Sequence, residues 1–194
     1  MHRTREPSPG FTLIELMVAL LVLLTLAAIA VPSFRDFFER GKVRGAAEDL
    51  VSTISQARAE AVKRDIDVSI AFAGGGTSWC MGGMSPNPPT GGARAAAAQA
   101  CNCDDDTPIA CTIGGEPYKV LSSTHPEIAI SGLPGTMIFD SNLGTLSNLA
   151  APEVTLTSPT GKYDVRVEVN ALGQARACTP DGKPTMSSLP ACAP

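Results

Sequence analysis

One unbroken apolar run, from Phe11 to Val31, constrains this 194-residue chain more than any other feature. Its 21 residues include a single charged side chain, Glu15. At a rise of 1.5 Å per residue, a helix of this length measures about 31 Å, enough to cross the hydrocarbon core of a membrane. Arg3 and Arg5 precede the run, and positive charge on that flank keeps an N-terminus in the cytoplasm. We therefore expect everything after Val31 to lie outside the cytoplasm.

Three kinds of N-terminal segment fit this run. A cleaved secretory signal peptide would use Ala28-Ile29-Ala30 as its small-residue cleavage site. An uncleaved signal anchor would keep the run, and a prepilin leader would be cut before it rather than after it. Glu15 favours the prepilin leader, because a carboxylate inside an apolar span costs about 2.5–3.5 kcal/mol on insertion scales. A subunit that pairs this carboxylate with a neighbour's cation has a reason to carry that cost.

The sequence GFTLIELMVALLVLLTLAAIAVPSF, which starts at Gly10, resembles the N-terminus of type IV pilins and type II secretion pseudopilins. The resemblance implies that a prepilin peptidase cuts after Gly10, removes residues 1–10 as a leader, and methylates the new amino terminus of Phe11. It also implies that Glu15 contacts the terminal amine of an adjacent subunit in a filament. Residues 11–31 are then the transmembrane helix segment of the mature protein.

Residues 32–64 are expected to form the exposed half of the same long helix. Pro32 removes one helical hydrogen bond and predicts a kink where the membrane segment gives way to this half. The alternative, that Pro32 ends the helix, is weakened by an apolar stripe that follows at three- and four-residue steps: Val43, Ala47, Leu50, Val51, Ile54, Ala57, Ala61 and Val62. Such a stripe predicts packing against a sheet.

The remainder, residues 65–194, is expected to form a β-rich head. Apolar residues that alternate with polar or small ones predict a strand at Ile66–Phe72. Further strands are predicted at Tyr118–Leu121, Glu127–Ile130, Thr136–Phe139, Val154–Thr157, Tyr163–Val169 and Gln174–Cys178. Residues 74–92, rich in glycine and proline, are expected to be a loop, and residues 93–100 a helical turn or an irregular segment.

The segment from Leu50 to Phe72 resembles the core signature of the GspH/FimT family of minor pilins and pseudopilins. Its hallmark is a helix that ends in Ala-Arg-x-Glu-Ala, here residues 57–61, and runs directly into the first strand. The C-terminal hairpin, with a Gly-x-x-Arg sequence at its turn, resembles the same family. The resemblance implies an α+β fold, in which a long N-terminal transmembrane helix continues into an amphipathic helix packed on antiparallel β-sheet.

All six cysteines follow the apolar run, and an even number in an exported domain predicts disulfides. Cys178 and Cys192 are neighbours near the C-terminus, so we expect them to pair and to pin a proline-rich tail. The other four, whose pairing the sequence leaves open, are expected to staple the long loop: Cys80, Cys101, Cys103 and Cys111. Cys101 and Cys103 are not expected to bond each other, because alternate strand positions face opposite ways.

Two metal sites compete with this interpretation of the loop. Its four cysteines offer enough sulfur ligands for zinc, but their spacing lacks paired Cys-x-x-Cys elements. The run Asp104-Asp105-Asp106 offers oxygen ligands for calcium, although three carboxylates in a row are more often a solvated loop. We therefore expect the protein to use no metal and no cofactor.

Composition argues against an enzyme and against a general nucleic-acid-binding protein. The chain has two histidines, His2 in the leader and His125, and nothing in the sequence places a base beside His125. The glycines at positions 74–76 lack the following lysine of a phosphate-binding loop. The formal net charge of −4 argues against a strongly basic surface. We therefore expect no catalytic residues.

DNA binding remains the alternative function. Some FimT-like minor pilins are implicated in DNA uptake through a C-terminal Gly-Arg-x-Arg motif, and the matching residues here are Gly173-Gln174-Ala175-Arg176, in which glutamine replaces the first arginine. The candidate phosphate contacts are Lys162, Arg166 and Arg176. From Asp65 onward the chain has 6 basic and 12 acidic residues, so we expect Arg176 to be an ordinary solvated strand residue.

The sequence thus predicts a minor pilin or pseudopilin, a structural subunit that initiates or caps a type IV pilus or a type II secretion pseudopilus. Its expected partners are other pilins, the prepilin peptidase and the inner-membrane assembly platform. Its expected location is the bacterial inner membrane, crossed once, with a cytoplasmic N-terminus and a periplasmic head, and afterwards the filament.

Overall fold

A computed structural model describes residues 10–85, 101, 103, 111–147 and 151–192. The expected helical turn at residues 93–100, the aspartates at 104–106 and most of the leader lie outside these described residues. The chain divides into two compact units, Met1–Phe38 and Glu39–Pro194. The helix α1, Leu13–Arg64, supplies the described helical part of the first unit and the first element of the second.

Thr12 begins helix α1 by capping its N-terminus. The backbone N–H of Glu15 donates to the Thr12 hydroxyl at 3.3 Å, and the N–H of Leu16 donates to the Thr12 carbonyl at 3.2 Å. Threonine followed three residues later by glutamate is the spacing of a capping box, which satisfies N–H groups that have no partner inside the helix. The helix then continues through position 32, so Pro32 does not end it.

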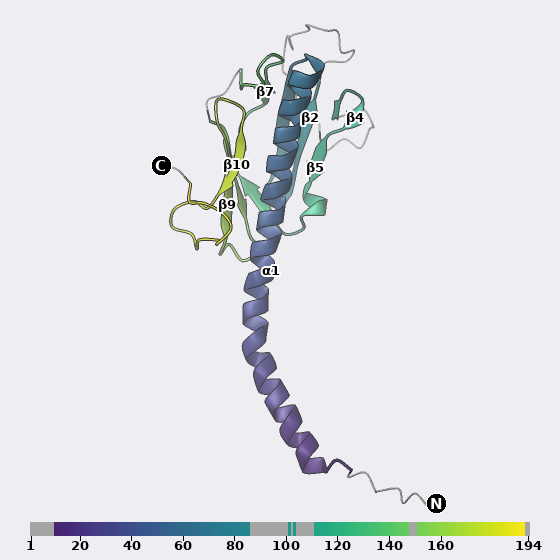
Figure 1. Cartoon of the computed structure of the whole chain (residues 1–194), viewed down its shortest axis with the longest axis vertical. Helices are drawn as coiled ribbons and strands as arrows, with labels where there is room; N and C mark the ends of the chain where they lie inside the picture. Colours follow the sequence, from purple (N-terminus) through teal and green to yellow (C-terminus); the bar gives the residue numbers. More distant parts are fainter. Residues whose placement is uncertain (1–9, 86–100, 102, 104–110, 148–150, 193–194) are drawn as a thin grey trace, which may run out of the picture. The chain divides into compact units, whose positions relative to one another are not determined.

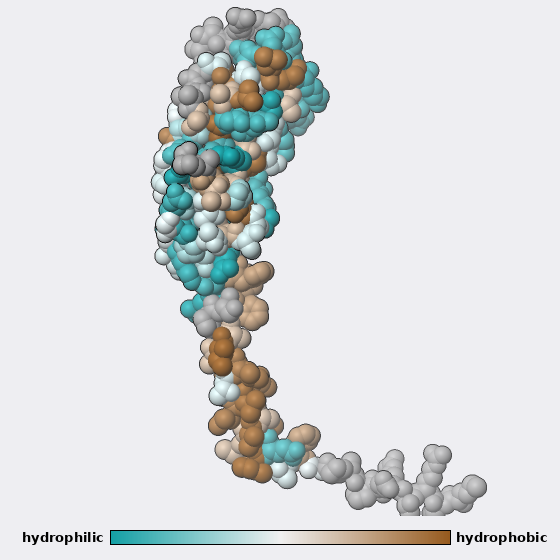
Figure 2. Space-filling model, turned by 60° about the vertical axis from the view of Figure 1, so that its left-hand side comes forward, coloured by the Kyte–Doolittle hydropathy of each residue, from teal (hydrophilic) through white to brown (hydrophobic). Residues whose placement is uncertain are grey.

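The apolar side chains of the first unit are exposed on all sides of α1. Leu13 is 76 % exposed, Leu21 65 % and Ile29 74 %. Figure 2 shows the resulting predominantly hydrophobic surface along this part of the helix. By length and composition, α1 is the one helix of the described chain that is long and apolar enough to cross a membrane.

In the second unit, α1 buries one stripe of side chains. Seven residues of the stripe are at most 1 % exposed: Val43, Ala46, Ala47, Leu50, Ile54, Ala57 and Ala61. These positions recur at three- and four-residue steps, so they share one face of the helix. The predicted stripe is confirmed with small differences, because Val51 is only partly buried and Val62 is 46 % exposed.

Helix α1 ends in a left-handed turn at Asp65, whose φ is 53°. The N–H of Ile66 donates to the carbonyl of Ala61 at 3.1 Å, and the N–H of Asp65 donates to that of Val62 at 3.4 Å. This pair of bonds is a Schellman motif, and the buried Ile66 supplies its apolar contact. The first strand, predicted from Ile66, therefore begins at Val68.

Two four-stranded antiparallel sheets make up most of the head. The first has the strand order β5-β2-β1-β7, with bounds Lys119–Leu121, Ser78–Met84, Val68–Gly75 and Met137–Phe139. The second has the order β10-β9-β8-β6, with bounds Ala175–Cys178, Asp164–Val169, Glu153–Thr157 and Ala129–Ser131. A small ribbon pairs β3, Thr112–Ile113, with β4, Glu116–Pro117, and a 3-10 turn, η1, covers Ser122–Thr124.

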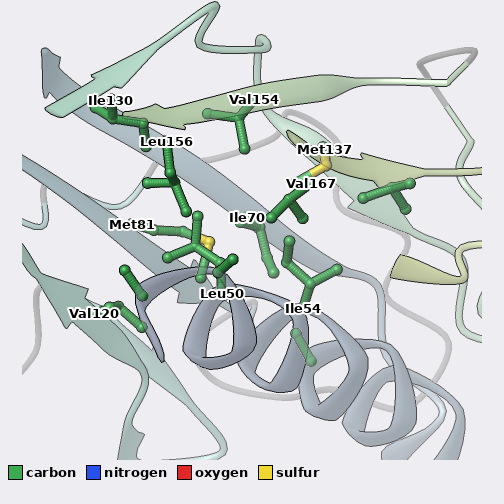
Figure 3. Close-up of a cluster of buried hydrophobic side chains, with 14 of the residues drawn as sticks. Leu50, Ile54, Ile70, Met81, Val120, Ile130, Met137, Val154, Leu156 and Val167 are labelled. Atoms are coloured by element: carbon green, nitrogen blue, oxygen red, sulfur yellow. The ribbon is translucent and has the colours of Figure 1, made fainter. Parts of the chain in front are cut away.

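The second half of α1 packs on both sheets (Figure 1). Figure 3 shows Leu50 and Ile54 of the helix among side chains from both sheets. The buried partners labelled there include Ile70, Met81, Val120, Ile130, Met137, Val154, Leu156 and Val167. The predicted α+β fold, with an amphipathic helix packed on antiparallel β-sheet, is confirmed.

Six of the predicted strands after the first begin and end within two residues of β5 to β10. The prediction of a loop across residues 74–92 is wrong in its first part, because Ser78–Met84 forms β2, a central strand between β1 and β5. Gly82 and Gly83 lie inside this strand rather than in a turn. A Cβ atom at Gly83 would lie 2.9 Å from the Ile113 side chain, so glycine is used here for close packing.

Candidate functional site

The predicted processing site lies just before helix α1. Gly10 and Phe11 precede the helical residues, and the Phe11 side chain is 84 % exposed. A Cβ atom at Gly10 would meet no atom within 4 Å, so the bond between Gly10 and Phe11 lies in open space.

Glu15 lies in the first turn of α1 and is exposed in the single chain. Its carboxylate Oε2 accepts a hydrogen bond from the Thr12 hydroxyl at 3.5 Å. A negative charge in the first turn is favoured by the partial positive charge of the helix N-terminus. The capping contact therefore holds the carboxylate at the end of the helix where cleavage after Gly10 would create a new amine.

The side chains of the family signature at residues 57–61 lie on two faces of α1. Ala57 and Ala61 are fully buried, and their small side chains lie in the helix face that packs on the sheets. Arg58 reaches outward instead, and its Nε donates a hydrogen bond to the carbonyl of Gly144 at 2.9 Å. The signature therefore joins the helix to a loop 86 residues later in the sequence.

Two glycine turns close around Arg58. Gly144 has a φ of +64°, and a Cβ there would lie 2.9 Å from the Arg58 Cγ. Gly173, in the turn between β9 and β10, has a φ of +76°, and a Cβ there would collide with the Gly144 carbonyl oxygen. Both positions require glycine, because they combine a left-handed backbone with backbone or side-chain atoms in contact.

Glu60, on the same signature, pairs with Arg64 and Lys63, the latter at 3.2 Å between Nζ and Oε1. Hydrogen bonds from Arg64 and then Lys63 hold the pKa of the Glu60 carboxyl below its usual range. The Arg64 guanidinium occupies the space that a Cβ at Gly114 would take. Glu60 therefore orients Arg64 against the loop between β3 and β4.

The arginines proposed for DNA contact lie on the solvent face of β9 and β10 and are paired with carboxylates. Arg176 donates from Nε and Nη2 to Glu168 Oε2, at 3.0 and 2.9 Å. Arg166 Nη1 lies 3.2 Å from Glu153 Oε2. The four charges balance, and they line an open groove of about 740 Å³ together with Gln174.

Lys162 does not join this groove. It precedes β9, and its ammonium lies 5.3 Å from the centre of the Tyr163 ring. The residues that line the groove do not include it. The structure therefore brings Arg166 and Arg176 together, as the hairpin predicts, and separates Lys162 from their face.

Two disulfides are present among the described cysteines. One joins Cys178 to Cys192, the pair that position in the sequence favoured, with 4.9 Å between the Cα atoms. The two ends of the tail between them are also joined by a backbone hydrogen bond, in which the Thr179 N–H donates to the Pro190 carbonyl at 2.8 Å. The other disulfide joins Cys80 to Cys103, with 5.8 Å between the Cα atoms, so Cys103 does not bond Cys101.

These disulfides bear on the metal sites considered from the sequence. Cys80, Cys101, Cys103 and Cys111 do form one buried cluster, but two of the four sulfurs are joined to each other. Among the described residues, Glu168, Cys178 and Cys192 have the spacing of metal ligands, yet the two sulfurs form a disulfide rather than thiolates. The cluster of four cysteines therefore matches a crosslinked core better than a zinc site.

His125 has a partner that the sequence did not suggest. Its Nε2 lies 2.9 Å from Oδ2 of Asp49 on α1, and its ring stacks on Trp79 at 6.3 Å between centres. Nothing in the sequence places a base beside His125, and the fold supplies a carboxylate there because helix packing brings Asp49 to it. The indole of Trp79 also donates to the Ile128 carbonyl at 2.9 Å, so this group fixes the edge of the head to the helix.

Two models of known protein families match this chain. Residues 46–173 match the family model described as type II transport protein GspH, and residues 8–31 match that of the prokaryotic N-terminal methylation motif. No curated protein matches the sequence. The type IV minor pilin FimU of Pseudomonas aeruginosa, strain PAO1, is among the similar solved structures. Its P21 crystal form gives 16 % identity, a TM-score of 0.47 and coverage of 72 % of this chain and 90 % of that one. Its P65 crystal form gives 18 % identity, a TM-score of 0.41 and coverage of 69 % of this chain and 90 % of that one.

The family model covers well over half of the chain, including the helix signature, the first sheet, strands β6, β8 and β9 of the second sheet, and the turn up to Gly173. The methylation motif lies N-terminal to it, on the segment that contains Gly10, Phe11 and Glu15. The chain therefore belongs to the GspH family of pilin-like type II transport proteins and carries the N-terminal methylation motif of prokaryotic pilins and pseudopilins.

Proposed function

We propose that this protein is a minor pilin or pseudopilin that initiates or caps a filament, and that it acts as a structural subunit rather than an enzyme. One observation carries the proposal. A methylation motif at residues 8–31 includes the first part of α1, which is apolar on every side, and the second part of the same helix is the core helix of a folded head. An element of this kind serves both as a membrane anchor and as the stem of a filament.

Export and processing follow from the same motif. We infer that the first part of α1 crosses the inner membrane with its N-terminus in the cytoplasm, and that the head folds in the periplasm. The exposed Gly10–Phe11 bond supports cleavage after Gly10 by the prepilin peptidase, followed by methylation of Phe11. The expected partners after processing are other pilins and the assembly platform of the inner membrane.

Within the filament, Glu15 is proposed to pair with the terminal amine of an adjacent subunit. Its carboxylate is exposed in the single chain and is held at the start of α1 by Thr12. A charge in an apolar environment is tolerated when an opposite charge compensates it. Pairing between subunits would provide that compensation at the point where the apolar helices pack together.

Substitutions at Glu15 separate this pairing from the capping role. Glu15→Gln keeps a side chain that can accept a bond from Thr12 but removes the charge, and Glu15→Ala removes both. We expect both variants to be cleaved and inserted in the membrane, and to be poorly incorporated into sheared filaments. Glu48→Gln, an exposed glutamate on the second half of α1, is the control and should be incorporated normally. Normal incorporation of Glu15→Gln would contradict the pairing.

The initiating or capping role is tested by varying the expression level of the protein. Deletion of the gene should lower the number of surface pili or block type II secretion, and the affected process identifies the machine. Expression of this protein at a level far below that of the major subunit should restore the affected process, because a filament needs few copies of an initiating or capping subunit. A requirement for amounts equal to the major subunit would contradict this role.

The alternative function, DNA binding for uptake, rests on the common face of Arg166 and Arg176. Both guanidinium groups are paired with carboxylates, so their charge is balanced locally. We expect little DNA binding at physiological salt, since phosphate contacts require uncompensated Lys or Arg. Micromolar binding in an anisotropy titration, abolished by Arg176→Ala and steeply salt-dependent, would favour the DNA-uptake function instead.

A further inference from the structure

The outer face of the first sheet carries a second, sulfur-rich cluster. Along β2, Trp79 and Met81 point into the main core, whereas the intervening residue Cys80 points to the opposite face. The cluster on that face contains the four cysteines Cys80, Cys101, Cys103 and Cys111, with partly buried Ala73, Met84 and Leu121 around them. Cys101, Cys103 and Cys111 therefore pack against this face of the sheet.

One crosslink already holds Cys103 to β2, because it is bonded to Cys80. The two thiols of the cluster are Cys101 and Cys111, which are 5 % and 4 % exposed. Buried thiols of this kind, side by side in an exported domain, are the usual precursors of a disulfide.

Gly82 shows how close the two sulfurs are. A Cβ atom built on Gly82 would lie less than 3.0 Å from the Sγ atoms of both Cys101 and Cys111. Two atoms within 3.0 Å of one point are at most 6.0 Å, twice that distance, from each other. The Cys101 thiol is also hydrogen-bonded to the Cys111 sulfur. The missing side chain at Gly82 thus leaves a space in which the two sulfurs meet above a central strand.

We propose that Cys101 and Cys111 form a third disulfide in the exported head, next to Cys80–Cys103. The inference rests on the periplasmic location of the head in the proposed function. A disulfide-bonded oxidant of the periplasm accepts the two electrons and two protons that the thiols lose, and is itself reduced to a dithiol. The new S–S bond closes residues 101–111 into a loop, anchored to β2 through Cys103.

The order of events follows from burial. Burial and the adjacent Cys111 sulfur raise the pKa of the Cys101 thiol, so the thiolate that attacks a disulfide is scarce in the folded head. The bond therefore forms before folding buries Cys101 and Cys111. Afterwards the buried sulfurs are protected from small reductants. Zinc is disfavoured at the same place, because four thiolate ligands would require the Cys80–Cys103 bond to be open.

Thiol counting on the full chain tests the proposal. The protein is exported, purified from membranes in detergent, and unfolded without reductant in the presence of N-ethylmaleimide, and its intact mass is measured. We expect no maleimide adduct. Two adducts would overturn the third disulfide while leaving export intact, since the other two bonds serve as internal controls. Six adducts would overturn both the disulfide and the periplasmic location.

Single substitutions then assign the pairing. Cys101→Ser should give one adduct per chain, on Cys111, and Cys111→Ser should give one on Cys101. Cleavage before Asp104 places Cys111 on a different peptide from Cys101 and Cys103, and fragment masses distinguish those two. The matched control, Cys178→Ser, should place its adduct on Cys192 alone. An adduct on Cys80 or Cys103 in the Cys101→Ser chain would overturn the proposed pairing.

Discussion

Helix α1 places the same residue type in two opposite environments. Leu21, in the first unit, is 65 % exposed, whereas Leu50, in the second, is fully buried. The first part of the helix is apolar on all sides and the second only along one stripe. The second part finds its packing partners in the sheets of its own chain. The first part must find them outside the chain, in lipid or in other subunits, because that much exposed apolar surface is unstable in water.

The largest effect on the head should come from truncating the buried stripe. We expect Leu50→Ala to lower its free energy of unfolding by about 2–5 kcal/mol, the usual cost of a buried leucine plus the cavity it leaves. Thermal unfolding of the full chain in detergent, followed by near-ultraviolet circular dichroism of the head, measures the loss.

Leu21→Ala is the matched control for that substitution. It removes the same atoms from the same helix, so it should leave the unfolding temperature of the head unchanged. It should instead reduce membrane or filament association. An equal loss of head stability in both variants would contradict the division of labour between the two parts of α1.

The next effect concerns the tail of the head, which depends on a crosslink more than on a core. Replacing both Cys178 and Cys192 by serine should cost about 3 kcal/mol, the chain-entropy value for a loop of about 15 residues. The same thermal measurement applies. A doubly substituted head as stable as the original would show that the tail is held by its backbone hydrogen bonds and the buried Met186 instead.

A smaller effect is expected where α1 meets the turn between β9 and β10. Gly173→Ala places a Cβ against the Gly144 carbonyl in a left-handed turn. Gly182→Ala is the control, because Gly182 also has a positive φ, +80°, but has open space around it. The control should cost about 1–2 kcal/mol, the penalty of the left-handed conformation alone. Gly173→Ala should cost more, and equal costs would show that the Arg58 contact does not hold the turn.

The sequence predicted the parts of this fold that depend on local patterns. The long helix, its stripe and six later strands follow from periodicity, which a single chain displays directly. Strand β2 was missed because Gly82 and Gly83 read locally as loop residues. Their reason for being glycine is contact with Ile113 and the cysteine cluster, which only the folded chain brings to them.

The candidate sites divide in the same way. The Gly10–Phe11 site and Glu15 lie in one short motif and are visible in the sequence. The roles of Arg58 and His125 depend on Gly144 and Asp49, each more than 70 residues away along the chain. The pairing of Arg176 with Glu168 follows from the register of β9 and β10, which places them opposite each other. The sequence alone does not display that register, so it does not show that Glu168 neutralises the arginine.

The smallest effect concerns Glu60 at the end of α1. Its Lys63 and Arg64 partners are partly exposed, so Glu60→Gln should cost less than about 1 kcal/mol at pH 7. Because folding lowers its pKa, the contribution is complete above the unfolded value of about 4.3 and is lost as the pH falls through the folded value. Denaturant midpoints of the two proteins should therefore converge as the pH falls through the lowered pKa of Glu60 in the folded protein. The control is Glu116→Gln, because Glu116 is exposed. Its denaturant midpoint should equal that of the original protein both at pH 7 and at low pH.

The mass of the mature protein tests most directly whether the first part of α1 is retained in the mature protein as its membrane and filament segment. Cleavage after Gly10 leaves residues 11–194, with a methylated amine on Phe11. The intact mass of protein extracted from membranes should match this species, and substitution of Gly10 should leave the precursor uncut. A mature chain that begins near Val31 would contradict the account, because the apolar part of the helix would then be a discarded signal peptide.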